Sequence, residues 1–139
     1  MVEQTADSLG APFLIHVVAP NFAFYKGKVR ANEAHNLLRS SYSNALATAT
    51  HEGSVRQIAF PLVSASPRLL NQDLDLLAVC KCGVESILDW SVGNKEGPKD
   101  IIMCTSTLAE AQVLESVADE VLKPNGNETR GSIKASRLH

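Results

Sequence analysis

The hydrophobic positions of the chain follow two alternating spacings. Runs of β-branched and other apolar residues, which are typical of buried strands, occupy residues 13–18, 55–63 and 100–105. After each run, apolar residues recur every three or four positions, over about 31–50, 71–92 and 106–122. This spacing places them on one face of a helix. The pattern therefore predicts three strands that alternate with three helices.

Polar residues and glycines mark the ends of these elements. Gly53 follows the first helical stretch and is suited to stop a helix. Asn71 or Asp73 is expected to cap the second helix, and Ser106 or Thr107 the third, because their side chains can accept hydrogen bonds from the first free N–H groups. After residue 122 the periodicity ends. The prediction is a domain over residues 1–122 and a flexible basic tail over 123–139.

Strands that alternate with helices build a mostly parallel sheet through right-handed crossovers. The expected fold class is therefore α/β, with three α/β/α layers. Ligands of such sheets bind at the C-terminal ends of the strands. In this sequence those ends are Ala19-Pro20-Asn21, the loop 64–70, and Thr105 with the two residues that follow it.

The composition is that of a single ordinary globular domain. Of 139 residues, 45% are hydrophobic and 20% are charged, with a net charge of -2. This charge favours neither nucleic acid nor an anionic membrane as a partner. No apolar run approaches the roughly 20 residues of a membrane span. Residues 1–10 have neither the basic nor the apolar region of a secretory signal, so we expect a cytoplasmic or nuclear protein.

Cysteine and histidine chemistry adds no predicted site. Cys80 and Cys82 lie two residues apart in a predicted helix, a spacing that suits neither a zinc site nor a redox pair. Buried, reduced thiols are the expectation for these two residues and for Cys104. His16, within the first strand, is interpreted as structural. We therefore predict no metal ligands, no catalytic residues and no cofactor.

Three segments, in this order, carry a resemblance to a known family. They are IHVVAP at 15–20, LRSSYSNAL at 38–46 and IAFPLVS at 58–64. They are similar to the IHAVGP strand, the L-x-x-x-Y-x-N-x-L helix and the IAFP-x-IS strand of macro domains, which bind ADP-ribose. The resemblance covers roughly residues 13–122. It implies a macro-like α/β fold, and ADP-ribose or a related nucleotide as the ligand.

The phosphate loop departs from the family pattern. Where the family reads S-T-G-I-F-G, this chain has the six residues 64–69, SASPRL, and both glycines are gone. Glycines allow backbone N–H groups to approach a pyrophosphate, whereas Pro67 has no N–H to donate. Arg68 could recover some attraction to phosphate. The ligand-binding residues that we predict are Ala19, Pro20, Asn21, Ser64, Ala65, Ser66, Arg68 and Thr105.

The family's N-terminal part also has no counterpart here. Residues 1–12 supply neither the Asn-containing motif nor the Gly-rich loop that bind the distal ribose and a phosphate, and that hold the catalytic groups of hydrolytic members. The resemblance implies that the first strand lacks its usual neighbour in the sheet. An open strand edge invites pairing, so we expect a homo-oligomer or a protein partner to cover it.

Three functions remain open at this stage. The first is a non-catalytic module with weak or vestigial binding of ADP-ribose or a related nucleotide. The second is a structural subunit whose macro-like surface forms a protein–protein interface. The third is an ADP-ribosyl hydrolase, which the absent N-terminal groups disfavour. The loop 21–30 mixes three aromatic with three basic residues and could either stack on a nucleotide or pack against helices.

Overall fold

The computed structural model describes residues 2–4, 10–123 and 133–137. Its strands are β1 (Val2–Gln4), β2 (Phe13–Ile15), β3 (Gln57–Pro61), β4 (Asp100–Thr105) and β5 (Ile133–Arg137). Its helices are α1 (Lys28–Glu52), α2 (Leu76–Gly93) and α3 (Leu108–Val121), with a short 3-10 helix, η2, at Phe22–Phe24. The predicted alternation of three strands and three helices from residue 13 onward is confirmed, with shifted ends.

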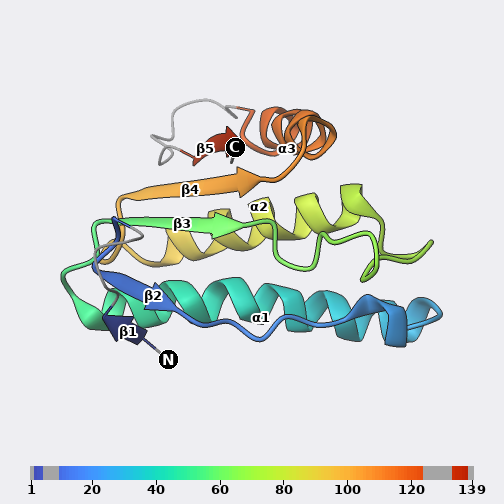
Figure 1. Ribbon diagram of the computed structural model, residues 1–139, viewed down its shortest axis with the longest axis horizontal. Coiled ribbons are helices and arrows are strands. Elements are labelled where there is room, and N and C mark those ends of the chain that lie inside the picture. Colours follow the sequence, from blue (N-terminus) through green and yellow to red (C-terminus); the bar gives the residue numbers. More distant parts are fainter. Residues whose placement is uncertain (1, 5–9, 124–132, 138–139) are drawn as a thin grey trace.

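The strands form two separate sheets. β1 and β2 pair antiparallel, with Glu3 opposite Leu14. β3, β4 and β5 form a parallel sheet in that order, with Ala59 opposite Ile102 and Ile102 opposite Lys134. In Figure 1 the strands follow one another across the view as β1, β2, β3, β4 and β5, but β2 does not pair with β3. The expected mostly parallel α/β sheet is therefore confirmed, with an interruption after β2.

All three helices lie along one face of the parallel sheet. On β3 the side chains of Ile58 and Phe60 are buried, whereas those of Gln57, Ala59 and Pro61 are exposed. Strand side chains alternate between faces, so only one face of β3 is covered by the helices. A three-layer arrangement would also have a helix on the other face, and the described part of the chain places none there.

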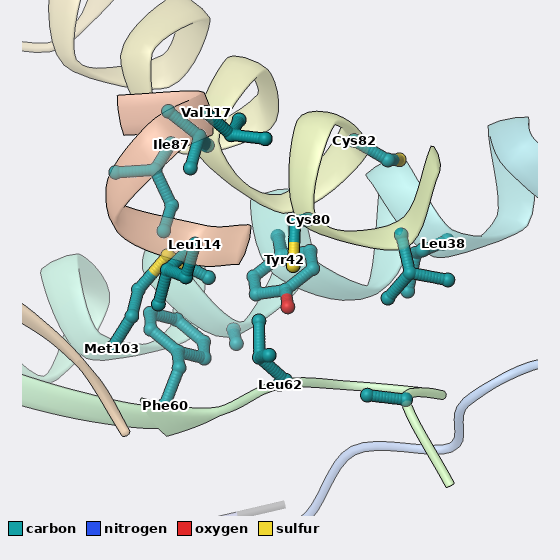
Figure 2. Close-up of a cluster of buried hydrophobic side chains, with 14 of the residues drawn as sticks. Leu38, Tyr42, Phe60, Leu62, Cys80, Cys82, Ile87, Met103, Leu114 and Val117 are labelled. Carbon is teal, nitrogen blue, oxygen red and sulfur yellow. The ribbon is translucent and has the colours of Figure 1, made fainter. Parts of the chain in front are cut away.

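The core lies between this covered face and the helices. Tyr42 of α1, Phe60 of β3, Met103 of β4 and Leu114 of α3 point toward one another in Figure 2. The rings of Tyr42 and Phe60 are tilted, with their centroids 5.3 Å apart. Gly83 of α2 leaves room for this contact, because a Cβ there would lie 3.0 Å from the Tyr42 hydroxyl. The sheet and all three helices thus share one core.

Helix caps account for most of the element ends. Gly53 ends α1 with a left-handed φ of 78°, as its position predicted. Thr107 begins α3 with a capping box to Glu110, which confirms one of the two proposed caps. The expected cap of α2 is wrong: Asp75 accepts from the N–H of Ala78, and the helix begins at Leu76.

Two strand predictions need correction. The first strand was expected over 13–18 but ends at Ile15, because no second strand pairs with its other edge in the described residues. Val18 is 94% exposed. Within the expected tail, 133–137 form β5, whose backbone pairs with β4. Residues 124–132 and 138–139 of that tail lie outside the described residues.

Candidate functional site

The loops that follow β2 and β3 are tied together at their bases. The hydroxyl of Ser64 donates to the carbonyl of Pro20 over 2.8 Å, and both residues are buried. Ser64 has a φ of 63°, the one positive φ at a non-glycine residue in the described chain. A left-handed backbone costs a residue with a side chain about 1–2 kcal/mol. The hydrogen bond to Pro20 offsets part of that cost.

The predicted phosphate loop folds into two successive turns. Ala65 N–H donates to Leu62 O (3.3 Å), and Leu69 N–H donates to Ser66 O (2.8 Å). Pro67 occupies the second position of the latter turn, which its fixed φ favours. Val63 N–H donates to the Tyr42 hydroxyl (3.1 Å). The backbone N–H groups of Ser64, Ser66 and Arg68 make no hydrogen bond within the described part of the chain, so they could meet an anion.

Ser66 and Arg68 are exposed on this loop, whereas Ala65 is buried. The guanidinium of Arg68 makes no ion pair with any described residue. The positive groups that a phosphate would meet here are therefore one exposed guanidinium and a few N–H groups. They do not form the continuous glycine-lined cradle of the family pattern.

The predicted site residues do not all meet in one place. Asn21 accepts from the N–H of Ala23 through its Oδ1 (3.1 Å) and thereby caps η2. Thr105 ends β4, is 2% exposed, and its hydroxyl has no hydrogen-bond partner in the described residues. Pro20 and Ser64 touch directly, and the other predicted residues except Thr105 lie on the loops that these two join.

In the segment 21–30, most of the aromatic side chains pack against the protein and few are exposed. Phe22 is fully buried, and Arg30 stacks over the ring of Tyr25 with 5.8 Å to its centroid. Asn71 holds the loop from the other side: its Nδ2 donates to Phe22 O (2.8 Å) and Tyr25 O (3.3 Å). Its Oδ1 accepts from the N–H groups of Asp73 and Leu74. Of the three aromatic side chains, Phe24 alone is strongly exposed, at 73%.

A cavity of about 850 Å³ opens between β2 and β3. It is lined by residues 10–17 and Ala19 on one side, by 54–64 on the other, and by Ala45 of α1. Its volume lies within the range of ordinary ligand pockets. Of the predicted site residues only Ala19 and Ser64 reach it, whereas Asn21, Ser66, Arg68 and Thr105 do not. Sequence reasoning missed this cavity, although the missing neighbour of the first strand was a signal for it.

Titratable groups in the core are held in their neutral forms. Burial raises the pKa of the Cys80 thiol and of the Cys82 thiol to about 11 each, and burial also raises the pKa of Cys104. The pKa of the Tyr42 hydroxyl is raised well above its usual range, mainly by burial. These cysteines are thiols at neutral pH and do not provide a nucleophile. No group of metal-ligating side chains occurs in the described residues.

The fold is that of an α/β module, in which the loops after β2 and β3 lie together and could hold a ligand. The family model of the Macro domain matches residues 1–73, which is more than half of the 139 residues. The chain therefore belongs to the Macro domain family, a family of ADP-ribose-binding modules, as the sequence motifs predicted. Searches of curated proteins and of solved structures give no match. No helix in the described residues is long and apolar enough to cross a membrane.

Proposed function

We propose that this chain is a non-catalytic macro module that binds ADP-ribose, or a related nucleotide, weakly through the loops after β2 and β3. The observation that carries the proposal is the 2.8 Å hydrogen bond from Ser64 to Pro20, which keeps the two loops together without the family's glycines. The exposed Ser66 hydroxyl, the Arg68 guanidinium and the N–H groups of Ser64, Ser66 and Arg68 are the donors for a phosphate.

Weak affinity follows from the way these donors are presented. Three N–H groups of the loop, those of Val63, Ala65 and Leu69, are already used inside the protein. Pro67 has none, and the loop leaves Arg68 in solvent, where an ion pair contributes about 0.2–1 kcal/mol. We therefore expect a dissociation constant between about 10 µM and 1 mM, which corresponds to a binding free energy of only about −7 to −4 kcal/mol.

Isothermal titration of the protein with ADP-ribose tests the proposal. Arg68→Ala should weaken binding about two- to fivefold. Ser66→Leu should weaken it further, because the larger side chain obstructs the phosphate. Arg56→Ala is the matched control, since Arg56 is also exposed but lies at the far end of β3, and it should leave the affinity unchanged. Absence of heat at millimolar ligand with folded protein would refute nucleotide binding.

A second function, that of an interaction module, is favoured by a different observation. The cavity lies between two strands, β2 and β3, that do not pair with each other, and α1 supplies Ala45 to its wall. A surface of this kind, with strand edges on both sides, is suited to bind another polypeptide. This function does not require a nucleotide. Its ligand can be specified further from the two strand edges.

A further inference from the structure

The outer edge of β3 presents backbone groups to the cavity that no described residue pairs with. Leu62 N–H donates to Cys104 O (3.2 Å), and Arg56 O accepts from Lys99 N–H (2.8 Å) and Asp100 N–H (3.2 Å). Backbone groups of a strand alternate in direction from one residue to the next. The backbone N–H and C=O groups of the even-numbered residues 56–62 therefore face β4. The N–H and C=O of Gln57 and Ala59, and the C=O of Pro61, point the other way.

Pro61 supports this assignment. Proline has no N–H, so within a sheet it is tolerated where that group would face away from the ladder. An N–H at position 61 would face away from β4, so the proline removes no hydrogen bond between the two strands. Pro61 still lies in register opposite Cys104. The outward edge that an incoming chain meets therefore offers two N–H donors, at Gln57 and Ala59, and three carbonyl acceptors.

The opposite wall of the cavity is also a strand. β2 pairs with β1, and in Figure 1 β1 lies on the side of β2 away from β3. β2 and β3 run in the same direction in that view. One further strand between them would connect the two sheets into a single one. An extended polypeptide is the ligand whose own N–H and C=O groups match edges on both sides.

The side chains around the cavity set the chemistry of that strand. Its inner side is apolar, with Ala45 and the buried Ile58 and Phe60. Arg56 is the one formally charged side chain among the described lining residues; it is exposed and has no ion-pair partner in the described chain. A complementary segment has apolar side chains at alternate positions and a carboxylate at the end that lies beside Arg56.

We propose that the cavity between β2 and β3 binds an extended segment of a partner protein, which adds as a strand and places an acidic residue beside Arg56. This inference rests on the interaction function proposed above and is independent of nucleotide binding. A strand added here satisfies the outward groups of Gln57 and Ala59, which no other described residue pairs with.

The probe is an acetylated, amidated heptapeptide with glutamate at each end and alternating valine and threonine between them. Glutamate at both ends places a carboxylate beside Arg56 in either strand direction. Hydrogen exchange of the full chain should show new protection of the Gln57 and Ala59 amides when the peptide is added. A peptide of the same sequence that is N-methylated at every residue should give none, because it has no backbone N–H group to donate at either edge.

Two variants of the protein separate strand addition from nonspecific binding. Ala59→Pro removes an outward N–H that β4 does not use, and should weaken peptide binding at least fivefold. Its fold is checked by circular dichroism. Arg56→Glu, at an exposed position, should weaken binding about two- to fivefold and should favour a peptide with lysine at each end. Lys95→Glu makes the same charge change outside the cavity and should have no effect.

Several outcomes would overturn the inference. One is absence of amide protection at Gln57 and Ala59 with millimolar peptide and folded protein. Another is binding that Ala59→Pro and Arg56→Glu both leave unchanged. A third is a concentration-dependent dimer, measured by light scattering, that Ala59→Pro dissociates; the occupant would then be a second copy of the chain. Titration with ADP-ribose is a separate measurement, so failure of one proposal is distinguishable from failure of the other.

Discussion

The two sides of β3 have opposite surroundings, although they belong to the same five residues. Toward the helices, Ile58 and Phe60 pack into a core closed by Tyr42, Met103 and Leu114, and the ladder to β4 is continuous. On the other side, Gln57, Ala59 and Pro61 are exposed and the free edge borders the cavity. A strand can thus be firmly held by one face and one edge while the rest remains available for binding.

The largest expected difference between the two sides concerns stability. Phe60→Ala removes a ring that is 4% exposed and contacts Tyr42, and should lower the free energy of unfolding by about 3–5 kcal/mol. Gln57→Ala, on the exposed face of the same strand, should change it by no more than about 0.5 kcal/mol. Urea unfolding followed by circular dichroism measures both. Equal losses in the two variants would show that the exposed face is covered.

A smaller effect is expected where β3 passes into its loop. Tyr42→Phe keeps the ring but leaves the N–H of Val63 without its 3.1 Å acceptor. The expected loss is about 1–3 kcal/mol, the cost of leaving the N–H of this half-buried residue without an acceptor. The same variant should weaken ADP-ribose binding, because Val63 precedes the Ser64 turn. An unchanged midpoint of urea unfolding would show that water or another group replaces the hydroxyl.

The smallest expected effect, for each group and each pH unit, is a pH dependence that is specific to the helical side. Cys80 and Cys82 have pKa values raised by burial from 9.0 to about 11. Between pH 9 and 11 the unfolded chain loses these protons and the folded chain keeps them. Stability should therefore be intact below pH 9 and should fall as pH rises toward 11, by on the order of 1 kcal/mol per pH unit and group.

Denaturant melts at pH 8, 9, 10 and 11 measure this dependence. The double variant Cys80→Ala/Cys82→Ala should have a shallower slope above pH 9, even though it is less stable throughout because it loses buried side chains. Val79→Ala/Val84→Ala is the matched control, since it also removes two buried side chains of α2 but no titratable group, and it should keep the slope. A slope that the double variant leaves unchanged would assign the alkaline loss to other groups.

Much of the fold was predictable because it depends on local spacing. Helical periodicity placed α1, α2 and α3, and the run 100–105 matched β4 from end to end. Gly53 and Thr107 ended and began their helices as expected, because left-handed backbone and a hydroxyl cap are properties of those residues alone. Asp75 was missed because Asn71 and Asp73 carry equally suitable side chains. Only the turn geometry decides which one lies at the helix start.

The candidate site was less predictable. The order of the motifs identified the family, and therefore the loops after β2 and β3, from sequence alone. The positive φ of Ser64 had no signal, since serine rarely takes that conformation, and the bond to Pro20 joins residues 44 positions apart. Phe22 and Tyr25, which read as stacking candidates, pack inward because Asn71 fixes their loop from a distant segment.

The sequence by itself determined which segments form helices and strands, which faces are apolar, and which family the chain belongs to, because these follow from residue type and local spacing. Only the tertiary structure decided that β2 stands apart from β3, that 133–137 pair with β4, and that the cavity lies between the two sheets. Strand pairing joins residues that are distant along the chain, so local spacing cannot specify the partner of a strand.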